Sequence, residues 1–301
     1  MRWAGVFPAV TTKMREDGSL DLAATQSSVD RLIAQGVSGV IMLPMLGENA
    51  SLSPSEKESV IRAVREAAAA RVPVLSGLAE VSTADAVRAA QLFEGCGAQG
   101  LMVFPSLAYT TDPRETGEWF KAIARASDLP IMIYNNPIAY KVDVSPPVLR
   151  ELIDVPTIQC IKEESGDIRR ITDIHNALGD RFSVSCGVDD LILESMALGA
   201  TGWVSGMVNA WPKECVRLFD LCSAGRFADA RALYRLLTPA FHLDTHVKLV
   251  QYIKLAEHAV YGAPEWVRAP RLPLVGEERR RVSSVIEATI EALRSFELPA
   301  L

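Results

Sequence analysis

The chain has 301 residues, of which 49% are hydrophobic and 23% charged, and its 31 basic and 37 acidic side chains leave a formal net charge of -6. This composition is typical of a globular protein with enough chain for a large core. The acidic balance argues against nucleic acid or an anionic membrane as the main partner, because both require a concentrated positive surface. No run of about 18 uncharged apolar residues predicts a membrane helix, and no signal peptide pattern opens the chain. We therefore expect a cytoplasmic protein that acts on a small molecule.

Eight short apolar runs predict β-strands along the chain. They cover residues 5–10, 37–44, 72–77, 100–105, 130–135, 157–162, 181–187 and 200–206. Several of these runs are apolar without alternation, which is typical of parallel strands covered by helices on both faces.

Helical segments separate the apolar runs. Ser53-Pro54-Ser55-Glu56 predicts a helix start, with a serine cap before proline and an acid in the first turn. Ser82, Asp112 and Ser145 precede similar segments. Eight strand-helix units predict an α/β fold, a (β/α)8 TIM barrel over residues 1–223. Residues 224–301 have helical patterning without a further strand, so we expect about three extra helices packed on the barrel or on a neighbouring subunit.

The cysteines and histidines show no metal-binding pattern. The five cysteines have no C-x-x-C spacing and are interpreted as reduced core residues, and the four histidines lack carboxylate or cysteine partners at ligand spacing. We therefore expect neither a disulfide nor a metal site.

Lys162 is the first candidate catalytic residue. It ends the apolar run 157–161, and the chain has only eight lysines. Chemistry in this fold lies at the carboxyl ends of the strands, where desolvation of an amine lowers its pKa and frees it to attack a carbonyl as a Schiff-base nucleophile. The alternative is an ion pair with Glu163 or Glu164. Tyr134 ends the preceding strand, and its phenol is expected within reach of the amine, where it would transfer protons.

Several runs resemble the dihydrodipicolinate synthase and N-acetylneuraminate lyase superfamily. The resemblance rests on the segments 5–12, 47–48, 129–137, 161–167, 187–190 and 198–209, and above all on Y-N-x-P at 134–137 followed by K-E-x-S-G-D at 162–167. It implies that Lys162 forms the Schiff base, that Tyr134 transfers protons and that the loop ending in Gly47-Glu48 binds the carboxylate of a 2-oxo acid. The expected substrate-binding residues are Met45, Leu46, Gly47, Tyr109, Gly187, Asp189, Val204 and Ser205.

The resemblance also implies a homotetramer, with Tyr109 near a subunit interface. It implies neither a metal ion nor an organic cofactor.

Three departures from the family pattern bear on the substrate. Met45 and Leu46 stand where the family has two hydroxyl residues, which leaves backbone N–H groups to bind the carboxylate and removes a proton-relay hydroxyl. One tyrosine of the family's P-Y-Y is displaced to Tyr109. The arginine that the synthase uses for a second carboxylate corresponds to Ala139, which disfavours dihydrodipicolinate synthesis.

The pattern is closest to the 1-pyrroline-4-hydroxy-2-carboxylate deaminases of bacterial hydroxyproline breakdown. This resemblance implies release of ammonia and 2-oxoglutarate semialdehyde from a cyclic imine carboxylate. The alternatives are an aldolase or dehydratase for a 2-keto-3-deoxy sugar acid, a condensation with pyruvate, and a sensor that binds a 2-oxo acid without turnover. In the sugar-acid alternative Asp189, Asp190 and Ser205 hold the hydroxylated tail, although the two aspartates are equally consistent with a helix cap.

Overall fold

The computed structural model describes residues 1–301 and contains a single eight-stranded parallel sheet that closes into a barrel. The strand order is β1-β8-β7-β6-β5-β4-β3-β2, and a parallel bridge between Ala9 and Ile41 joins the first and second strands. The strands are β1 (Gly5–Pro8), β2 (Val40–Met42), β3 (Val74–Leu78), β4 (Leu101–Val103), β5 (Ile131–Asn135), β6 (Ile158–Glu163), β7 (Ser183–Cys186) and β8 (Gly202–Ser205). The predicted (β/α)8 barrel is confirmed.

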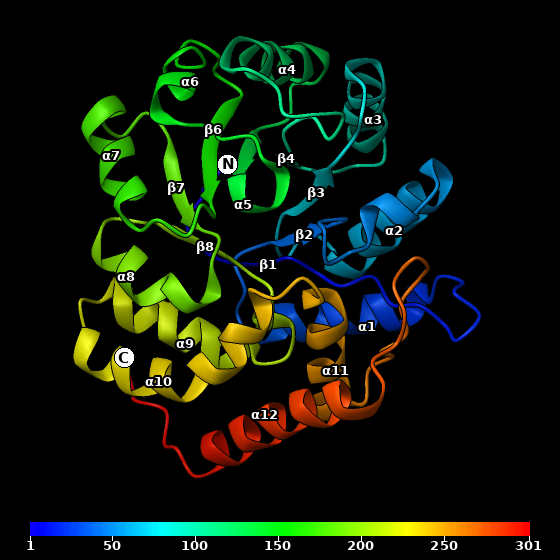
Figure 1. Ribbon diagram of the computed structural model, residues 1–301, viewed down its shortest axis with the longest axis vertical. Coiled ribbons are helices and arrows are strands. Elements are labelled where there is room, and N and C mark those ends of the chain that lie inside the picture. Colours follow the sequence, from blue (N-terminus) through cyan, green and yellow to red (C-terminus); the bar gives the residue numbers. More distant parts are fainter.

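Helices surround the barrel on its outer side (Figure 1). They are α1 (Leu22–Ala34), α2 (Pro54–Ala68), α3 (Thr83–Gly95), α4 (Pro113–Ala126), α5 (Pro137–Tyr140), α6 (Pro146–Arg150), α7 (Arg169–Leu178), α8 (Ile192–Ala197) and α9 (Pro212–Ser223). Short 3-10 turns lie at η1 (Asn49–Ser51), η2 (Asp189–Leu191) and η3 (Met207–Asn209). The predicted caps at Ser53, Ser82 and Asp112 accept backbone hydrogen bonds, whereas the Ser145 side chain makes no capping bond.

The strands are shorter than the apolar runs that predict them, because the backbone turns before some runs end. In the second run, Leu43 has a φ of 55°, which takes the chain out of the sheet directly after β2. The strand residues are otherwise almost all buried, as expected for a sheet with side chains packed on both faces. All five cysteines are buried free thiols.

Three further helices follow the barrel: α10 (Phe227–Asp244), α11 (Leu249–Tyr261) and α12 (Gly276–Arg294). In Figure 1, α12 runs along the outer side of α10 and α11. Helix α10 packs against α9, and Arg31 of α1 lies over the ring of Tyr261 at the end of α11. No helix combines the length and apolar character of a membrane-spanning segment.

A buried charge network joins α11 to the loops after β1 and β2. The Lys13 amine pairs with Glu257 and donates to Thr11 Oγ1 at 2.6 Å, and Lys254 Nζ lies 2.5 Å from Glu48 Oε1. All four charged side chains are fully buried. Burial lowers the pKa of Lys13 to about 8 despite the Glu257 carboxylate beside it. Because loss of one partner would leave a buried charge uncompensated, this network holds the helical tail in place against the barrel.

Candidate active site

Tyr134 and Lys162 lie side by side at the carboxyl ends of β5 and β6. The parallel register pairs the two residues directly. Lys162 Nζ lies 4.0 Å from the centroid of the Tyr134 ring, in the geometry of a cation–π contact. Lys162 is 7% exposed and Tyr134 5% exposed. The structure therefore brings together the two residues that the sequence predicts as catalytic.

The lysine is ion-paired, and its partner is Glu164. Lys162 Nζ lies 2.6 Å from Glu164 Oε2. Glu163, between them in sequence, faces away from the amine, because its carboxylate accepts hydrogen bonds from the Ser165 backbone and the Asn135 amide. The structure thus shows the ion pair that the sequence offers as the alternative for Lys162, and the role of Lys162 as a Schiff-base nucleophile stays a prediction.

Asn136 connects the phenol to this carboxylate. Its amide Nδ2 donates to the Tyr134 hydroxyl at 3.2 Å and to Glu164 Oε1 at 2.9 Å. Burial and the charge of Glu164 raise the pKa of Tyr134 well above its usual value. The phenol is therefore protonated at neutral pH and available as a proton donor.

Gly187 adjoins the lysine side chain. A Cβ at this position would lie 3.0 Å from Lys162 Cε and 2.9 Å from Glu164 Cβ, both closer than ordinary van der Waals contact. The absence of a side chain after β7 therefore leaves room for Lys162 and Glu164 to occupy the mouth.

The loop after β2 presents two free backbone donors. The N–H groups of Met45 and Leu46 donate no hydrogen bond within the chain, whereas those of Gly47 and Glu48 bond to carbonyl groups of the same turn. Gly77 is required beneath this loop, because a Cβ there would lie 2.2 Å from the Leu43 carbonyl oxygen. Two adjacent N–H groups in a tight turn are suited to binding a carboxylate.

Glu48 itself does not face the barrel mouth. Its carboxylate is fully buried and bonds to Lys254 and to the backbone N–H of Arg268. The resemblance to the family marks the loop that ends in Gly47-Glu48, and in this structure the glutamate anchors that loop to the helical tail.

Asp189 is fully buried and makes no helix cap. Its carboxylate accepts hydrogen bonds from Trp203 Nε1 at 2.9 Å and from the backbone N–H of Met207 at 2.8 Å. Asp190 instead lies 2.7 Å from Nδ1 of His242. The cap interpretation of the acidic pair is wrong, because helix α8 begins without a side-chain cap and both carboxylates bond elsewhere. Burial raises the pKa of Asp189 to about 6.

Asp244, at the end of α10, adds a second carboxyl group beside Asp189. A Cβ on Gly206 would lie 2.5 Å from Asp244 Oδ1 and 3.0 Å from Leu46 Cδ1, so the side chain reaches over the end of β8 toward the loop after β2. Burial and the neighbouring Asp189 carboxylate raise the pKa of Asp244 well above its usual value. Ionisation of Asp189 therefore disfavours ionisation of Asp244, and the two groups titrate as a pair.

The remaining predicted residues divide between the mouth and the surface. Val204 and Ser205 are buried at the end of β8, and Ser205 Oγ accepts the backbone N–H of Val208 at 3.1 Å. Tyr109 is 59% exposed, and its hydroxyl donates to Glu115 at 2.8 Å. The structure therefore does not bring Tyr109 to Lys162 within one chain.

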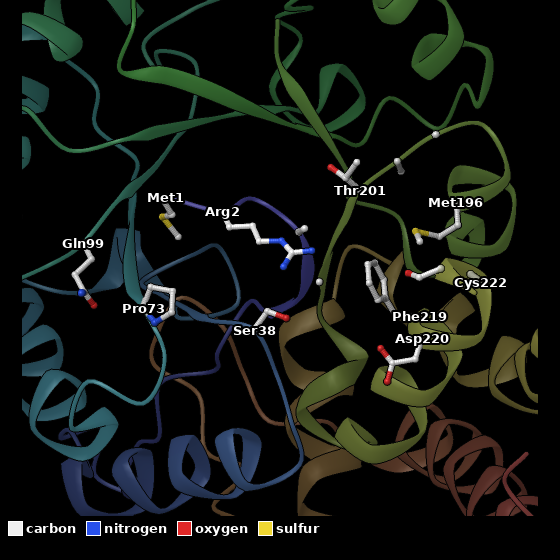
Figure 2. A pocket seen from close by; sticks show the side chains of 15 residues that line it. Met1, Arg2, Ser38, Pro73, Gln99, Met196, Thr201, Phe219, Asp220 and Cys222 are labelled. Atoms are coloured by element: carbon white, nitrogen blue, oxygen red, sulfur yellow. The ribbon is translucent and has the colours of Figure 1, made fainter. Parts of the chain in front are cut away.

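An open depression of about 1120 Å³ lies at the other end of the barrel. It is lined by residues that precede the strands, among them Arg2, Ser38, Pro73 and Thr201, and Figure 2 shows the Arg2 side chain extending into it. Catalytic groups in this fold lie at the carboxyl ends of the strands, so we place the active site at Lys162 rather than in this depression.

A buried lysine beside a phenol and a carboxylate, at the carboxyl end of a barrel, is the arrangement of an enzyme that binds its substrate as a Schiff base. A family model described as the dihydrodipicolinate synthetase family matches residues 2–289. The 4-hydroxy-tetrahydrodipicolinate synthase of Methanothrix thermoacetophila is 33% identical over 289 residues, covering 94% of this chain and 95% of the relative. The chain belongs to the dihydrodipicolinate synthetase family.

Solved structures agree with this assignment. A dihydrodipicolinate synthase from Bacillus anthracis is 28% identical with a TM-score of 0.91, covering 95% of this chain and 98% of that chain. The chloride-inhibited synthase from Acinetobacter baumannii, solved with pyruvate, is 26% identical with a TM-score of 0.89, covering 96% and 99%. The chain is thus a class I aldolase or lyase of this family.

Sequence reasoning missed two site residues. Asn136 occupies the variable position of Y-N-x-P, and only the structure shows its bonds to Tyr134 and Glu164. Asp244 lies 82 residues after Lys162, in the helical tail, and no local motif marks it.

Proposed function

We propose that this protein deaminates 1-pyrroline-4-hydroxy-2-carboxylate, or a closely related cyclic imine carboxylate, through a Schiff base on Lys162. The observation that carries the proposal is the distribution of charge around the lysine. The loop after β2 offers two free N–H groups, Glu164 is paired with the lysine, and the Lys162 charge acts on both Asp189 and Asp244. Such a mouth suits a substrate with one carboxylate and a tail that is cationic or hydroxylated.

The acidic mouth disfavours a substrate with a second carboxylate. Like charges at short range in a buried site repel strongly, and position 139 is alanine, so it supplies no guanidinium to offset them. This repulsion is the main physical argument against synthesis of 4-hydroxy-tetrahydrodipicolinate. It sets this chain apart from the relative that is 33% identical and is named a 4-hydroxy-tetrahydrodipicolinate synthase.

The proposed reaction balances without a further reagent. Glu164, in contact with the amine, takes the Lys162 proton, and the free amine adds to C2 of the ring imine. Opening of the ring C–N bond leaves a lysine imine at C2 and a free amine at C5. Loss of a C3 proton gives an enamine that expels the 4-hydroxyl group as water. A proton then moves from C5 to C3, which shifts the double bond to C4 and C5, and protonation at C4 converts this second enamine into an imine at C5. Hydrolysis of the two imines, at C2 and C5, releases 2-oxoglutarate semialdehyde and ammonia, with a net uptake of one water.

A keto-deoxy sugar acid is the second candidate substrate. The Asp189 and Asp244 carboxyl groups could accept hydrogen bonds from its hydroxyls, and cleavage or dehydration would also begin with an imine on Lys162. The two functions differ in their products, because aldol cleavage releases pyruvate and deamination releases ammonia.

The test is borohydride reduction with each substrate, followed by peptide mass spectrometry and measurement of ammonia and pyruvate. We expect an adduct on Lys162 that is absent from Lys162→Ala, and ammonia release from the hydroxypyrroline carboxylate at a higher kcat/KM than pyruvate release from any sugar acid. Lys13 is the internal control, because it is also a buried lysine that follows a strand but is bonded to Thr11 and Glu257. An adduct on Lys13, or efficient pyruvate release without ammonia, would overturn the proposal.

We also propose that the protein self-associates as a homotetramer. Three large apolar side chains that follow β3, β4 and β5 are each at least 59% exposed: Val81 and Tyr109 on loops and Ile138 in α5. Such residues favour a covered surface. Sedimentation velocity at micromolar concentration checks this, and a fully active 32.7 kDa species would contradict it.

A further inference from the structure

Arg271, in the loop between α11 and α12, lies beside the loop that follows β2. Its Nη2 lies 3.4 Å from Met45 Sδ, and its Nη1 lies 3.8 Å from Glu48 Oε2. Met45 and Glu48 are the two ends of the turn in which the N–H groups of Met45 and Leu46 are free. A guanidinium from the helical tail therefore adjoins the turn that is suited to binding a carboxylate.

The fold uses little of this guanidinium. An arginine side chain carries five N–H donors, and the one hydrogen bond that the Arg271 side chain makes goes to the Met45 sulfur, a weak acceptor. The Glu48 carboxylate is beyond hydrogen-bond distance of Arg271 and already accepts from Lys254 Nζ and from the backbone N–H of Arg268. The Arg271 side chain is only 21% exposed, so water does not fully replace the missing acceptors.

Arg268, three residues earlier, shows the contrast with an arginine that serves the fold. Its side chain donates to the backbone carbonyls of Gly18 and Ser51 and to both carboxylate oxygens of Glu56. Arg271 has no carbonyl or carboxylate acceptor of this kind. Its position therefore calls for an explanation other than support of the loop that carries it.

The buried side of the turn holds more positive than negative charge. Glu48 lies between two cations, with Lys254 Nζ at 2.5 Å and Arg271 Nη1 at 3.8 Å. The nearby pair of Lys13 and Glu257 adds no net charge. Because Glu48 and Lys254 are fully buried, water screens this excess weakly. One positive charge is thus left to attract an anion on the open side of the turn.

Other contacts fix the shape of the turn. Thr12 Oγ1 donates to the Gly47 carbonyl at 2.8 Å, and Asn49 Nδ2 donates to the Leu43 carbonyl at 2.8 Å. A turn that is already held in place needs no rearrangement to benefit from a charge behind it. Removal of the Arg271 charge should therefore leave the turn folded and weaken only its attraction for an anion.

We propose that Arg271 is a positioning residue that acts through the turn from Met45 to Glu48, and that its charge makes the site select carbonyl or imine substrates with an adjacent carboxylate. The charge draws the carboxylate to the free N–H groups of Met45 and Leu46, and the neighbouring carbon is then presented to Lys162. No bond forms or breaks at Arg271. The inference rests on the proposed function, since it assumes an imine on Lys162 and a carboxylate at this turn.

The test compares pyruvate with methyl pyruvate, the neutral ester of the same acid. The rate of the borohydride-trapped adduct on Lys162 is measured by peptide mass spectrometry at ligand concentrations well below saturation. We expect Arg271→Gln to lower the rate with pyruvate by about 3- to 30-fold, because one charge is removed at short range. The rate with methyl pyruvate should stay within about twofold of wild type. Arg271→Lys keeps the charge and should recover most of the pyruvate rate.

A second measurement separates binding from the later steps. Exchange of the pyruvate C3 protons for deuterium in D2O is followed by NMR, because it requires an imine but no second substrate. In Arg271→Gln the KM for pyruvate should rise by about 3- to 30-fold, while the rate at saturating pyruvate stays within about twofold, as expected for an interaction that acts on binding alone. Arg279→Gln is the matched control, because Arg279 lies in the same tail but is bonded to both oxygens of Glu265 at 2.8 Å. It should behave as wild type with both ligands.

Three results would overturn this role. Equal slowing of pyruvate and methyl pyruvate in Arg271→Gln would assign Arg271 to packing only. An unchanged pyruvate rate in Arg271→Gln would show that its charge does not reach the substrate, and a lack of recovery in Arg271→Lys would show that charge is not the cause. Each of these leaves the wild-type adduct on Lys162 intact. If wild-type protein forms no such adduct with pyruvate, the proposed function fails first and the role of Arg271 with it.

Discussion

Tyr134 and Lys162 occupy paired positions on β5 and β6, and the lysine amine lies 4.0 Å from the centroid of the tyrosine ring. Adjacent parallel strands of a barrel bring their ends to the same face, so two residues that are 28 positions apart in sequence meet at one place. The contact holds the amine over the ring, while Glu164 approaches it from the same strand end.

Substitution of Gly187 should displace the nucleophile. In Gly187→Ala the new Cβ would lie 3.0 Å from Lys162 Cε and 2.9 Å from Glu164 Cβ, so one of these side chains must move. We expect the borohydride-trapped adduct of pyruvate on Lys162 to form about 10- to 100-fold more slowly, because displacing a reacting group by about 1 Å slows a reaction by this order. Gly95→Ala is the control, since no atom lies within 4 Å of its added Cβ. Equal trapping rates in the two variants would contradict the packing argument.

Restoring hydroxyls in the loop after β2 should not improve deamination. The double substitution Met45→Thr and Leu46→Thr adds the two side-chain hydroxyls that this loop lacks, while the backbone N–H groups remain. Deamination expels water and cleaves no C–C bond, so it does not depend on a threonine relay. Ammonia release measured from 1-pyrroline-4-hydroxy-2-carboxylate should therefore be unchanged or lower. A large increase would show that the reaction needs those hydroxyls.

The activity should fall at acidic pH through the carboxyl pair of Asp189 and Asp244. Burial raises the pKa of Asp189 to about 6, so this carboxyl is ionised above that pH and neutral below it. The ionised form pairs with the amine that ring opening releases, so kcat/KM should decrease as pH falls through about 6. The apparent pKa of this decrease belongs to the two coupled carboxyl groups together. In Asp244→Ala, water reaches Asp189 and the decrease should move to lower pH. Asp190→Asn, which alters the pair with His242 instead, should keep the wild-type profile. A flat wild-type profile between pH 5 and 7 would exclude this role.

The ion pair of Glu56 and Arg268 should make stability sensitive to acid. Arg268 Nη1 and Nη2 bond to the two Glu56 carboxylate oxygens at 2.9 and 2.8 Å and lower the pKa of Glu56 to about 2, against an ordinary value of 4.5. Because the pKa is lower in the folded state, the stabilisation is complete above about pH 4.5 and is lost as pH falls toward 2.

The substitution Glu56→Gln tests this ion pair while keeping an oxygen that can accept the Ser53 backbone N–H. It should lower the free energy of unfolding at pH 7 by about 1–2 kcal/mol, a value reduced for the partial exposure of the pair. Urea unfolding at pH 7 and pH 2 measures it, with the exposed pair of Glu58 and Arg62 as the reference for a small effect. If the free energies of unfolding of Glu56→Gln and wild type differ as much at pH 2 as at pH 7, the Glu56–Arg268 ion pair is not the source of the difference.

The sequence by itself determined the barrel and its nucleophile candidates, because both depend on local patterns. Continuous apolar runs between capped helices define the strands, and a lysine at the end of such a run, as at Lys162, must lie at the barrel mouth. The run from Tyr134 to Pro137 is likewise readable without coordinates.

Only the tertiary structure decided which groups surround the lysine. Glu163 and Glu164 are equivalent in sequence, but the backbone direction at the end of β6 turns one toward Asn135 and the other toward Lys162. Asp244 and Arg271 reach the site through the packing of α10 and of the loop between α11 and α12, which depend on contacts between distant segments. Such contacts leave no periodic signal in the sequence, because each involves a single side chain whose partner is chosen by the folded backbone rather than by its neighbours in the chain.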